Sequence, residues 1–364
     1  MPSKPVRRTD QVDLAFSDRR GRPLLEDPVS KDLSAIARAG ACLFLACDEV
    51  AGVERLTRQG DGRFGAHQHI SLTEFFDLPG GPDQEMDIEG LAAVDGYLWI
   101  VGSHALKRKK PKHRETIEVD LLQDMRELVC EPNRYFLGRV PLQEGPSGTF
   151  NLIRRLGERS AACLGMGGAR GGLARWLYKD PLLAPFLKVP AKENGVDIEG
   201  IAVSGSRVWL GLRGPVLSGH AVLLELLLKE TKSGRLKPTR LEPDRRRYRR
   251  HLLDTGGLGI RDLRLDGEDL LLLVGPTMAL EGTAHVLRWR GAIHDQAEGL
   301  VPREHLEIVA HLPYSRDADH PEGLELWPEA GRSALLVVYD APAGKRLERA
   351  GRTVRADVLL AEPS

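Results

Sequence analysis

An internal repeat is the feature that most constrains this sequence. The segments Asp87-Ile88-Glu89-Gly90-Leu91-Ala92 and Asp197-Ile198-Glu199-Gly200-Ile201-Ala202 are nearly identical. Each segment continues through a short turn into a second β-like run, which carries a tryptophan twelve positions after the leading aspartate, Trp99 or Trp209. Two such runs joined by a Gly-containing turn are typical of a β-hairpin. The chain therefore contains at least two copies of one β unit.

Three weaker copies align with the same template. Most copies are followed by two further β-like runs, and four-stranded units repeated along a chain are typical of a β-propeller. We therefore predict an all-β chain that folds as a single β-propeller domain over residues 1–364, with five blades. The weaker copies are Asp32-Leu33-Ser34-Ala35-Ile36, Gly259-Ile260-Arg261-Asp262-Leu263 and His320-Pro321-Glu322-Gly323-Leu324.

One interval between copies, from residue 87 to residue 197, is longer than the others. It could contain a sixth blade without the repeat signature, but an insertion in the second blade over residues 104–190 is the interpretation we favour. Apolar residues at helical spacing predict a helix over 115–129, and a second, shorter helix is predicted over 173–187. The Gly-rich segment 165–172 predicts a loop between them. The insertion is therefore expected to be mainly helical.

Polar residues recur at positions that a propeller would bring together. First strands begin, and second strands end, at the same mouth of the central channel. Carboxylates gathered there repel one another unless an arginine or a hard cation compensates their charge. The ends of the second strands supply Asp48, Glu49, Ser103, His104, Arg213, Thr277, Tyr339 and Asp340. The candidate ligands of a divalent cation, calcium, magnesium or manganese, come from the first strands and are Asp87, Glu89, Asp197, Glu199 and Glu322.

Other residue types at the same mouth suggest catalysis. His104 and His320 are candidates for a general base, since imidazole titrates near neutral pH. Arg213 and Arg261 are candidates for holding an anionic group. The alternative is structural: the carboxylates could cap backbone amides or form salt bridges between blades, and the histidines could make surface hydrogen bonds. The sequence has no Gly-x-Ser-x-Gly elbow.

A basic run follows His104 directly. Because it would overhang the mouth, we expect Lys107, Arg108, Lys109 and Lys110 to attract an anionic ligand. Lys and Arg number 52, and so do Asp and Glu, so no overall charge draws the protein to nucleic acid. The expected partner is a small anionic molecule or a peptide, and nucleic acid is an alternative that the composition does not favour.

The chain shows no targeting or membrane signal. Residues 1–8 are not followed by the apolar stretch of a signal peptide, and no apolar run approaches the length of a membrane span. We therefore expect a cytoplasmic protein without membrane contact. The four cysteines are too irregularly spaced for a disulfide framework or a zinc site.

The motifs together resemble one family over residues 25–362. They include the two Asp-Ile-Glu-Gly segments, Gly102-Ser103-His104 with the lysine run, Lys192-Glu193-Asn194-Gly195, Gly211-Leu212-Arg213-Gly214-Pro215 and His320-Pro321-Glu322-Gly323. This set resembles the bacterial domain-of-unknown-function 3616 family, which implies no established activity.

The Glu-Gly pair at a strand start is also similar, more distantly, to calcium-dependent propeller hydrolases such as phytase-like esterases and lactonases. That resemblance implies calcium ligands at Glu89, Glu199 and Glu322, but Arg261 and Ser34 interrupt the ring. Two functions follow. The first is a metal-assisted hydrolase of phosphate or carboxylate esters or lactones. The second is a non-catalytic binding module for an anionic molecule, a peptide or nucleic acid.

Overall fold

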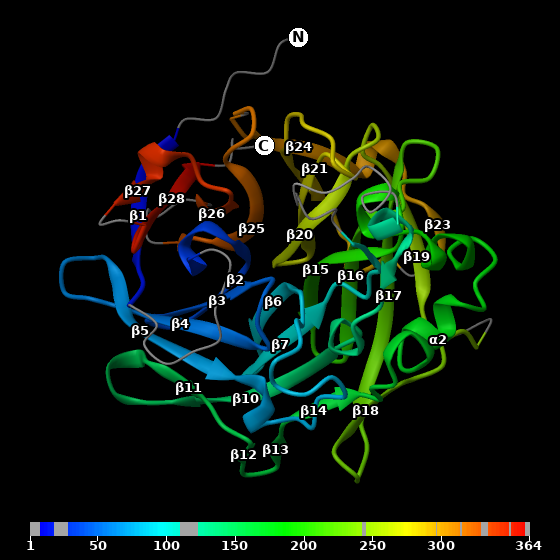
Figure 1. Ribbon diagram of the computed structural model, residues 1–364, viewed down its shortest axis with the longest axis horizontal. Helices are drawn as coiled ribbons and strands as arrows, with labels where there is room; N and C mark the ends of the chain where they lie inside the picture. Colours follow the sequence, from blue (N-terminus) through cyan, green and yellow to red (C-terminus); the bar gives the residue numbers. More distant parts are fainter. Residues whose placement is uncertain are drawn as a thin grey trace.

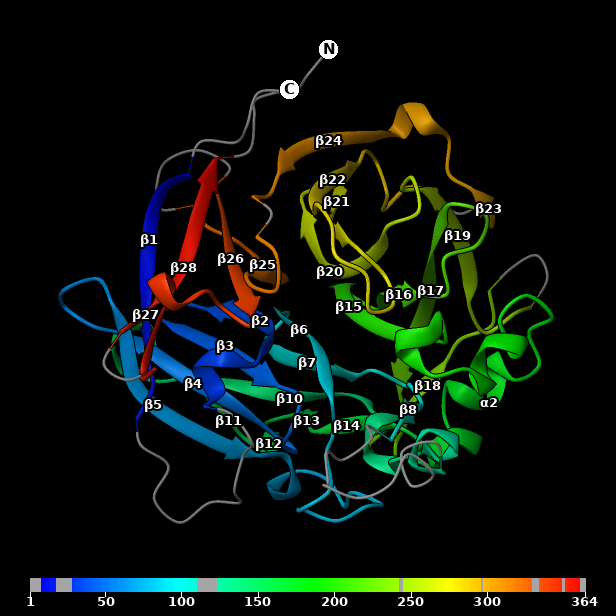
Figure 2. The same ribbon diagram turned by 45° about the horizontal axis from the view of Figure 1, so that its top comes forward.

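The strands of the chain form antiparallel groups that lie around a common axis, as Figures 1 and 2 show. Within the described ranges the structure is mostly β, as the sequence predicts. The computed structural model describes residues 8–17, 28–109, 123–241, 245–295, 297–313, 315–328, 334–348 and 351–360.

Each group contains four strands that follow one another from the axis to the outside. The first group is β2 (Leu33–Ala39), β3 (Cys42–Cys47), β4 (Gly52–Arg58) and β5 (Phe64–Ser71). The second is β6 (Ile88–Val94), β7 (Tyr97–Gly102), β10 (Leu137–Glu144) and β14 (Ala162–Leu164). The third is β15 (Asp197–Ser204), β16 (Arg207–Gly214), β17 (His220–Glu230) and β19 (Arg249–Asp254).

The remaining groups come from the C-terminal part of the chain and from its N-terminal strand. The fourth is β20 (Gly259–Asp266), β21 (Asp269–Gly275), β22 (His285–Trp289) and β24 (Leu306–His311). The fifth is β25 (His320–Leu326), β26 (Ala334–Asp340), β28 (Thr353–Leu360) and β1 (Arg8–Ala15). The inner strands contact one another in the order β2, β6, β15, β20 and β25, and β25 contacts β2 again. The inner strands therefore form a closed, propeller-like ring.

Short strands extend these groups at their edges. β11 (Phe150–Leu152) pairs with β10, β23 (Gly299–Leu300) with β19, and β27 (Leu347–Glu348) with β28. β18 (Arg235–Pro238) pairs with both β14 and β17 and so connects the second and third groups. Two separate antiparallel pairs are β8 (Lys107–Arg108) with β9 (Leu128–Val129), and β12 (Arg155–Leu156) with β13 (Arg159–Ser160).

The ends of the chain close the ring. β1 pairs antiparallel with β28, and a parallel contact between Leu14 and Phe64 joins it to β5 (Figures 1 and 2). Leu14 is fully buried in a cluster with Phe64 and Trp327. Residues 8–15 are not part of the sequence repeat, because this single strand lacks the repeated start.

A β-bulge occurs at the same place in all five inner strands. At each bulge, one residue is skipped in the register with the second strand. A bulge leaves its residue outside the ladder and changes the direction of its side chain. The skipped residues are Ser34, Glu89, Glu199, Arg261 and Glu322.

The glycine after the bulge allows adjacent inner strands to pack closely. A Cβ atom on Gly90 would lie 2.7 Å from Val101 Cγ1 and 3.0 Å from Ile201 Cγ2. These distances are shorter than ordinary van der Waals contact, so a larger residue would push β6 away from β15. The Glu-Gly pair of the sequence thus combines a polar side chain with a close contact between strand groups.

Residues 104–190 contribute strands as well as helical turns. β10 pairs with β7 along its length, so part of this range belongs to the sheet of the second group. The range 173–187, predicted as a second helix, contains the four-residue helix α2 (Ala174–Leu177) and the start of a 3-10 turn over Ala184–Lys188. Most of the predicted first helix lies outside the described residues. Its expected C-terminal end is wrong, because Leu128–Val129 is strand β9.

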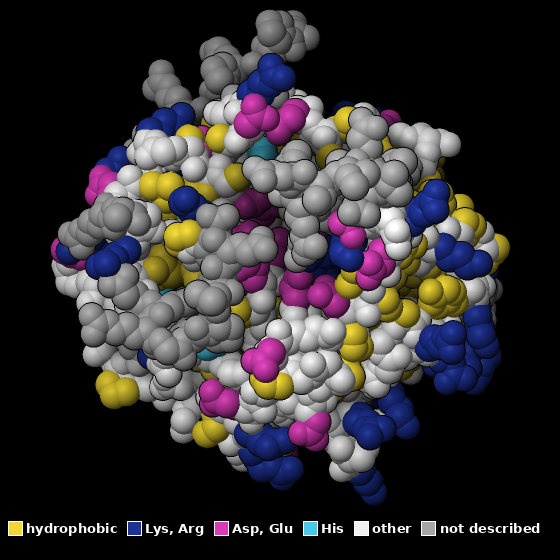
Figure 3. Space-filling model, viewed as in Figure 1, with side chains coloured by type: hydrophobic (Ala, Val, Ile, Leu, Met, Phe, Trp, Pro, Cys, Tyr) yellow, Lys and Arg dark blue, Asp and Glu magenta, His cyan; other side chains and the backbone are white. Residues whose placement is uncertain are grey.

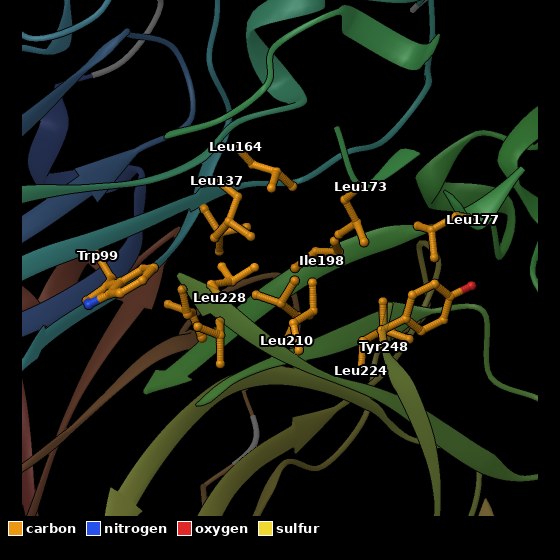
Figure 4. Close-up of a cluster of buried hydrophobic side chains, with 14 of the residues drawn as sticks. Trp99, Leu137, Leu164, Leu173, Leu177, Ile198, Leu210, Leu224, Leu228 and Tyr248 are labelled. Carbon is orange, nitrogen blue, oxygen red and sulfur yellow. The ribbon is translucent and has the colours of Figure 1, made fainter. Parts of the chain in front are cut away.

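A buried apolar cluster connects the second group, α2 and the third group. Figure 4 shows side chains from these elements packed against one another. Because α2 contributes Leu177 and the preceding residue is Leu173, the helical part of 104–190 covers the junction between two strand groups. The labelled cluster residues are Trp99, Leu137, Leu164, Leu173, Leu177, Ile198, Leu210, Leu224, Leu228 and Tyr248.

The structure contains no helix, among the described residues, that is long and apolar enough to cross a membrane.

Candidate functional site

A cavity of about 1260 Å³ opens where the inner strands begin and the second strands end. Figure 3 shows acidic side chains gathered in a depression at the centre of this face, with basic side chains beside them. All the carboxylates predicted as metal ligands line this cavity, as do Arg213, Arg261 and His320. The polar lining includes Asp32, Ser34, Asp48, Glu85, Asp87, Glu89, Asp197, Glu199, Arg213, Arg261, Glu281, Asp319, His320, Glu322 and Asp340.

Three carboxylates converge on one side of the cavity. Asp48 follows β3, Asp87 precedes β6, and Glu89 occupies the bulge of β6. One oxygen from each lies within 4.8 Å of the others. The backbone also brings them together: Asp87 has a left-handed conformation, with φ of 51°, and its N–H donates to the carbonyl of Asp48 over 3.1 Å. Carboxylate oxygens at this spacing are suitable ligands for a hard divalent cation.

The electrostatics of this cluster are dominated by negative charge. Burial is the largest cause that raises the pKa of Glu89 well above its ordinary value, and the charges of Asp48 and Glu199 raise it further. Burial, followed by the charge of Asp87, likewise raises the pKa of Asp48 well above its ordinary value. Both carboxyls are therefore costly to ionise unless a positive charge enters the cluster.

Arg134 compensates part of this charge. Its guanidinium is buried and contacts Asp87 and Glu85, and its Nε donates to Glu131 Oε2 over 2.7 Å. The ion pairs, opposed by burial, raise the pKa of Arg134 above its ordinary value. Asp87 is thus both a member of the cluster and the partner of a buried arginine.

Two further arginines line the cavity, Arg213 from β16 and Arg261 from β20. Arg213 Nη1 lies 2.8 Å from Glu199 Oε1 and 3.8 Å from Asp197 Oδ2. Arg261 forms ion pairs with Glu199, over 3.1 Å, and with Glu322. Asp197, Glu199 and Glu322 are thus paired with these two arginines, so four of the five predicted metal ligands contact an arginine when Asp87 is included.

The network shifts the pKa of Asp197. Burial, followed by the charge of Glu199, raises its pKa to about 8, although Arg213 opposes the change. Burial lowers the pKa of Arg261, and the charge of Arg213 lowers it further. Burying the charge of either Asp197 or Arg261 without a partner would therefore cost free energy.

The structure separates the two predicted catalytic histidines. His320 lies at the rim, where Nε2 is 3.2 Å from Glu281 Oε1 and Nδ1 is 3.9 Å from Asp340 Oδ2. Its pKa is raised, chiefly by the neighbouring carboxylate of Asp340. His320 can therefore carry a proton at the edge of the cavity.

His104 is not one of the cavity-lining residues. Its backbone has a φ of 56° two residues after the end of β7, and its side chain is buried beside the ring of Tyr135. Nδ1 donates to the carbonyl of Gly102 over 2.9 Å. Burial lowers the pKa of His104 to about 4, so the ring is neutral near pH 7. The turn after β7 thus directs this side chain away from the mouth.

The basic run lies at the cavity but is matched by acidic partners. Lys107, Arg108 and Lys109 line the cavity, and Lys110 lies outside the described residues. Each described member contacts a carboxylate, so the run does not present uncompensated positive charge. The contacts are Lys107 Nζ with Glu85 at 2.7 Å, Arg108 Nη2 with Glu193 at 2.8 Å, and Lys109 Nζ with Glu127 at 2.8 Å and Asp124 at 3.1 Å.

Comparison with protein families gives one match that spans most of the chain. The model of the family described as "Protein of unknown function (DUF3616)" matches residues 32–357. The chain belongs to this family. The resemblance in the repeated Asp-Ile-Glu-Gly motifs is therefore confirmed as family membership. Among curated proteins, no match to this DUF3616 chain was found.

Solved structures resemble the DUF3616 chain only distantly. The PQQ-bound aldose sugar dehydrogenase of Streptomyces coelicolor has 12% identity and a TM-score of 0.38, over 97% of this chain and 99% of that one. The GH43 endo-arabinanase of Bacillus licheniformis has 10% identity and a TM-score of 0.39, over 92% and 96%. An exo-1,5-alpha-L-arabinanase from a bovine ruminal metagenomic library has 11% identity and a TM-score of 0.38, over 92% and 97%. At these values no activity is transferred.

Two residues of the DUF3616 site lay beyond the predicted ligand set. Asp48 was expected at the mouth, as the end of a second strand, but was not proposed as a ligand. Arg134 was not considered, because it is the last residue of a short 3-10 turn (Pro132–Arg134) in the range interpreted as an insertion. The repeat places Asp48 one residue after the end of β3, and that position was the available signal.

Proposed function

We propose that this DUF3616 protein binds a divalent cation, calcium, magnesium or manganese, through Asp48, Asp87 and Glu89. The observation that carries the proposal is the convergence of their three oxygens within 4.8 Å. The strongest charged influences on Glu89 are all carboxylates, namely those of Asp48, Glu199, Asp87 and Asp197. A bound cation would compensate this charge and would favour the ionised ligands.

The ion pairs of Arg213 and Arg261 exclude three of the predicted carboxylates from the proposed set of cation ligands. Glu199 and Glu322 already contact Arg261, and Asp197 lies near Arg213. Removing any of these carboxylates from its arginine would leave a buried charge uncompensated. Asp87 also contacts an arginine, but Arg134 has Glu85 and Glu131 as further partners. We therefore assign Glu199, Glu322 and Asp197 to the support of the arginines rather than to the cation.

The proposed activity is hydrolysis of a phosphate ester, a carboxylate ester or a lactone. A cation at Asp48, Asp87 and Glu89 would supply a Lewis acid and an activated water. Arg213 and Arg261, held by Glu199, would orient an anionic group of the substrate. His320 at the rim would carry the proton to or from solvent, helped by Asp340.

We interpret the ring of strand groups as a five-bladed β-propeller with this site at one channel mouth. Support comes from the contacts of each inner strand with the next around the closed ring and from the bulge that all five share. Residues 87–197 contain no additional inner strand in their described part, which supports five blades over six.

The experiment is a hydrolysis assay on metal-depleted and metal-reloaded protein, with p-nitrophenyl phosphate, p-nitrophenyl acetate and a simple lactone as substrates. We expect activity that chelator removes and one of the three cations restores. Glu89→Gln should abolish the restored activity, whereas Glu89→Asp should keep part of it. Cation binding without hydrolysis of any substrate would contradict the catalytic proposal and favour a binding module.

A further inference from the structure

A Ser-His-Glu arrangement lies outside the cavity, on the outer strands of the first group. Ser17 follows β1, His67 lies in β5 and Glu54 lies in β4. Ser17 Oγ is 3.0 Å from His67 Nδ1, and His67 Nε2 is 2.6 Å from Glu54 Oε2. None of the three lines the cavity, so this arrangement is independent of the proposed cation site.

The hydrogen bonds fix the tautomer of His67. The backbone N–H of Ser17 also donates to Nδ1, over 3.1 Å, and an amide can only donate. Nδ1 therefore carries a lone pair, and the ring proton of the neutral imidazole is on Nε2, where it faces Glu54. The hydroxyl of Ser17 therefore donates to the same nitrogen atom, Nδ1. His67 is thus arranged as a base toward the serine, with the carboxylate behind it.

The supporting residues are held rigidly, while the serine is accessible. The side chain of Glu54 is fully buried and that of His67 is 2% exposed. The other oxygen of Glu54 lies 2.8 Å from His69 Nδ1. The ring of Phe16 packs edge-on against His67, with 5.2 Å between the ring centres. Ser17 itself is exposed, so a small molecule can reach its hydroxyl.

We propose that Ser17 is a nucleophile that accepts an acyl group from small carboxylic esters, with His67 as its base and Glu54 as the positioning carboxylate. Ser17 Oγ forms a bond to the ester carbonyl carbon while its proton passes to His67 Nδ1. The carbon–oxygen bond to the alcohol then breaks, and the leaving oxygen takes that proton from Nδ1. Water releases the acyl group by the same sequence. Glu54 stabilises the imidazolium that forms in each half.

The sequence did not reveal this arrangement. Ser17 has no elbow motif, and its partners are 37 and 50 positions away on two other strands. The ring is also used in the opposite sense to the familiar triad, with Nδ1 rather than Nε2 toward the serine. Only the pairing of β1 with β28 and its contact with β5 bring Ser17 to His67.

The test uses a fluorophosphonate probe on the full-length protein, with peptide mapping of the modified residue. We expect the phosphonyl group on Ser17 of the wild type, no labelling in Ser17→Ala, and unchanged labelling in Ser233→Ala, which removes another exposed serine. His67→Gln should slow labelling by about a hundredfold or more, the usual contribution of a general base. Labelling must be insensitive to chelator, which separates this site from the cation site.

Two results would overturn the proposal. One is a wild-type protein whose Ser17 stays unmodified while trypsin is fully labelled under the same conditions. The other is a folded His67→Gln protein that is labelled as fast as the wild type. The wild-type map decides the first point even if His67→Gln fails to fold, and Glu54→Gln provides a second variant for the rate.

Discussion

The backbone N–H of Asp87 donates a hydrogen bond to the carbonyl oxygen of Asp48, with 3.1 Å between nitrogen and oxygen. This contact joins the start of β6 to the residue after β3, so it holds carboxylates from two strand groups in one place. A hydroxyl contact, Ser34 Oγ to the carbonyl of Ile88 over 2.6 Å, joins the same two groups nearby. The backbone therefore keeps the acidic cluster assembled although its charges repel.

Metal-depleted protein should lose stability as the pH rises. The folded-state pKa values of Asp48 and Glu89 are raised, and that of Asp197 is about 8, so these three carboxyls bind protons more tightly in the folded chain above about pH 4. His104, with its pKa lowered to about 4, acts in the opposite direction but is one group against three. The free energy of unfolding should thus fall between about pH 5 and about pH 8. Urea unfolding in chelator at both pH values measures this.

Glu89→Gln is the matched variant for that experiment, because it removes one titrating group and keeps the shape of the side chain. Its fall in the free energy of unfolding should be smaller than that of the wild type by about 1 kcal/mol or more. Equal pH dependence in the two proteins would show that Glu89 is not under the repulsion described here.

Arg261→Gln should strongly destabilise the protein. The substitution leaves the buried carboxylates of Glu199 and Glu322 without this partner, and breaking a buried ion pair costs about 3–5 kcal/mol. Urea unfolding at neutral pH measures the loss. The double variant Arg261→Gln with Glu322→Gln should recover part of it, and a single variant as stable as the wild type would contradict the arginine-centred network.

Lys109→Ala should leave the affinity for inorganic phosphate unchanged. The ammonium of Lys109 is already in contact with Asp124 and Glu127, so it contributes little free positive charge to the mouth. Isothermal titration with phosphate compares the variant with the wild type. A clear loss of affinity for phosphate would contradict this prediction and would show that the basic run binds the anion.

Leu14→Ala should destabilise the ring at its closure. Leu14 is fully buried, and its loss leaves a cavity between β1 and β5, which costs about 2–5 kcal/mol. Thermal or urea unfolding measures the cost. Val12→Ala, at a partly buried position on the same strand, is the control and should cost less.

The repeat carried most of what the sequence could predict. The Glu-Gly pairs at residues 89 and 322 mark bulges that direct carboxylates into the cavity, because pattern and backbone geometry are linked locally. The repeat did not predict the orientation of His104. A positive φ turns this side chain toward Tyr135, and residue spacing alone cannot reveal a backbone dihedral angle.

Long-range contacts were the other limit. Closure of the ring by β1 joins residues that are more than 300 positions apart, such as Leu14 and Val354, and no local pattern predicts that pairing. The partners of Arg261 lie on two other strand groups, and those of Arg134 include two carboxylates that precede β6. The choice among them depends on the rotamer that each long side chain adopts. Sequence reasoning therefore identified the charges at the mouth but not how they divide into ion pairs and an acidic cluster.

The metal content of the purified protein tests the central claim most directly. Elemental mass spectrometry should find about one equivalent of calcium, magnesium or manganese per chain in the wild type. Glu89→Gln should lose it, and the control Glu322→Gln, whose carboxylate contacts Arg261, should retain it. Absence of metal from all three proteins after dialysis against each cation, or equal metal in Glu89→Gln and the wild type, would contradict a cation site at Asp48, Asp87 and Glu89.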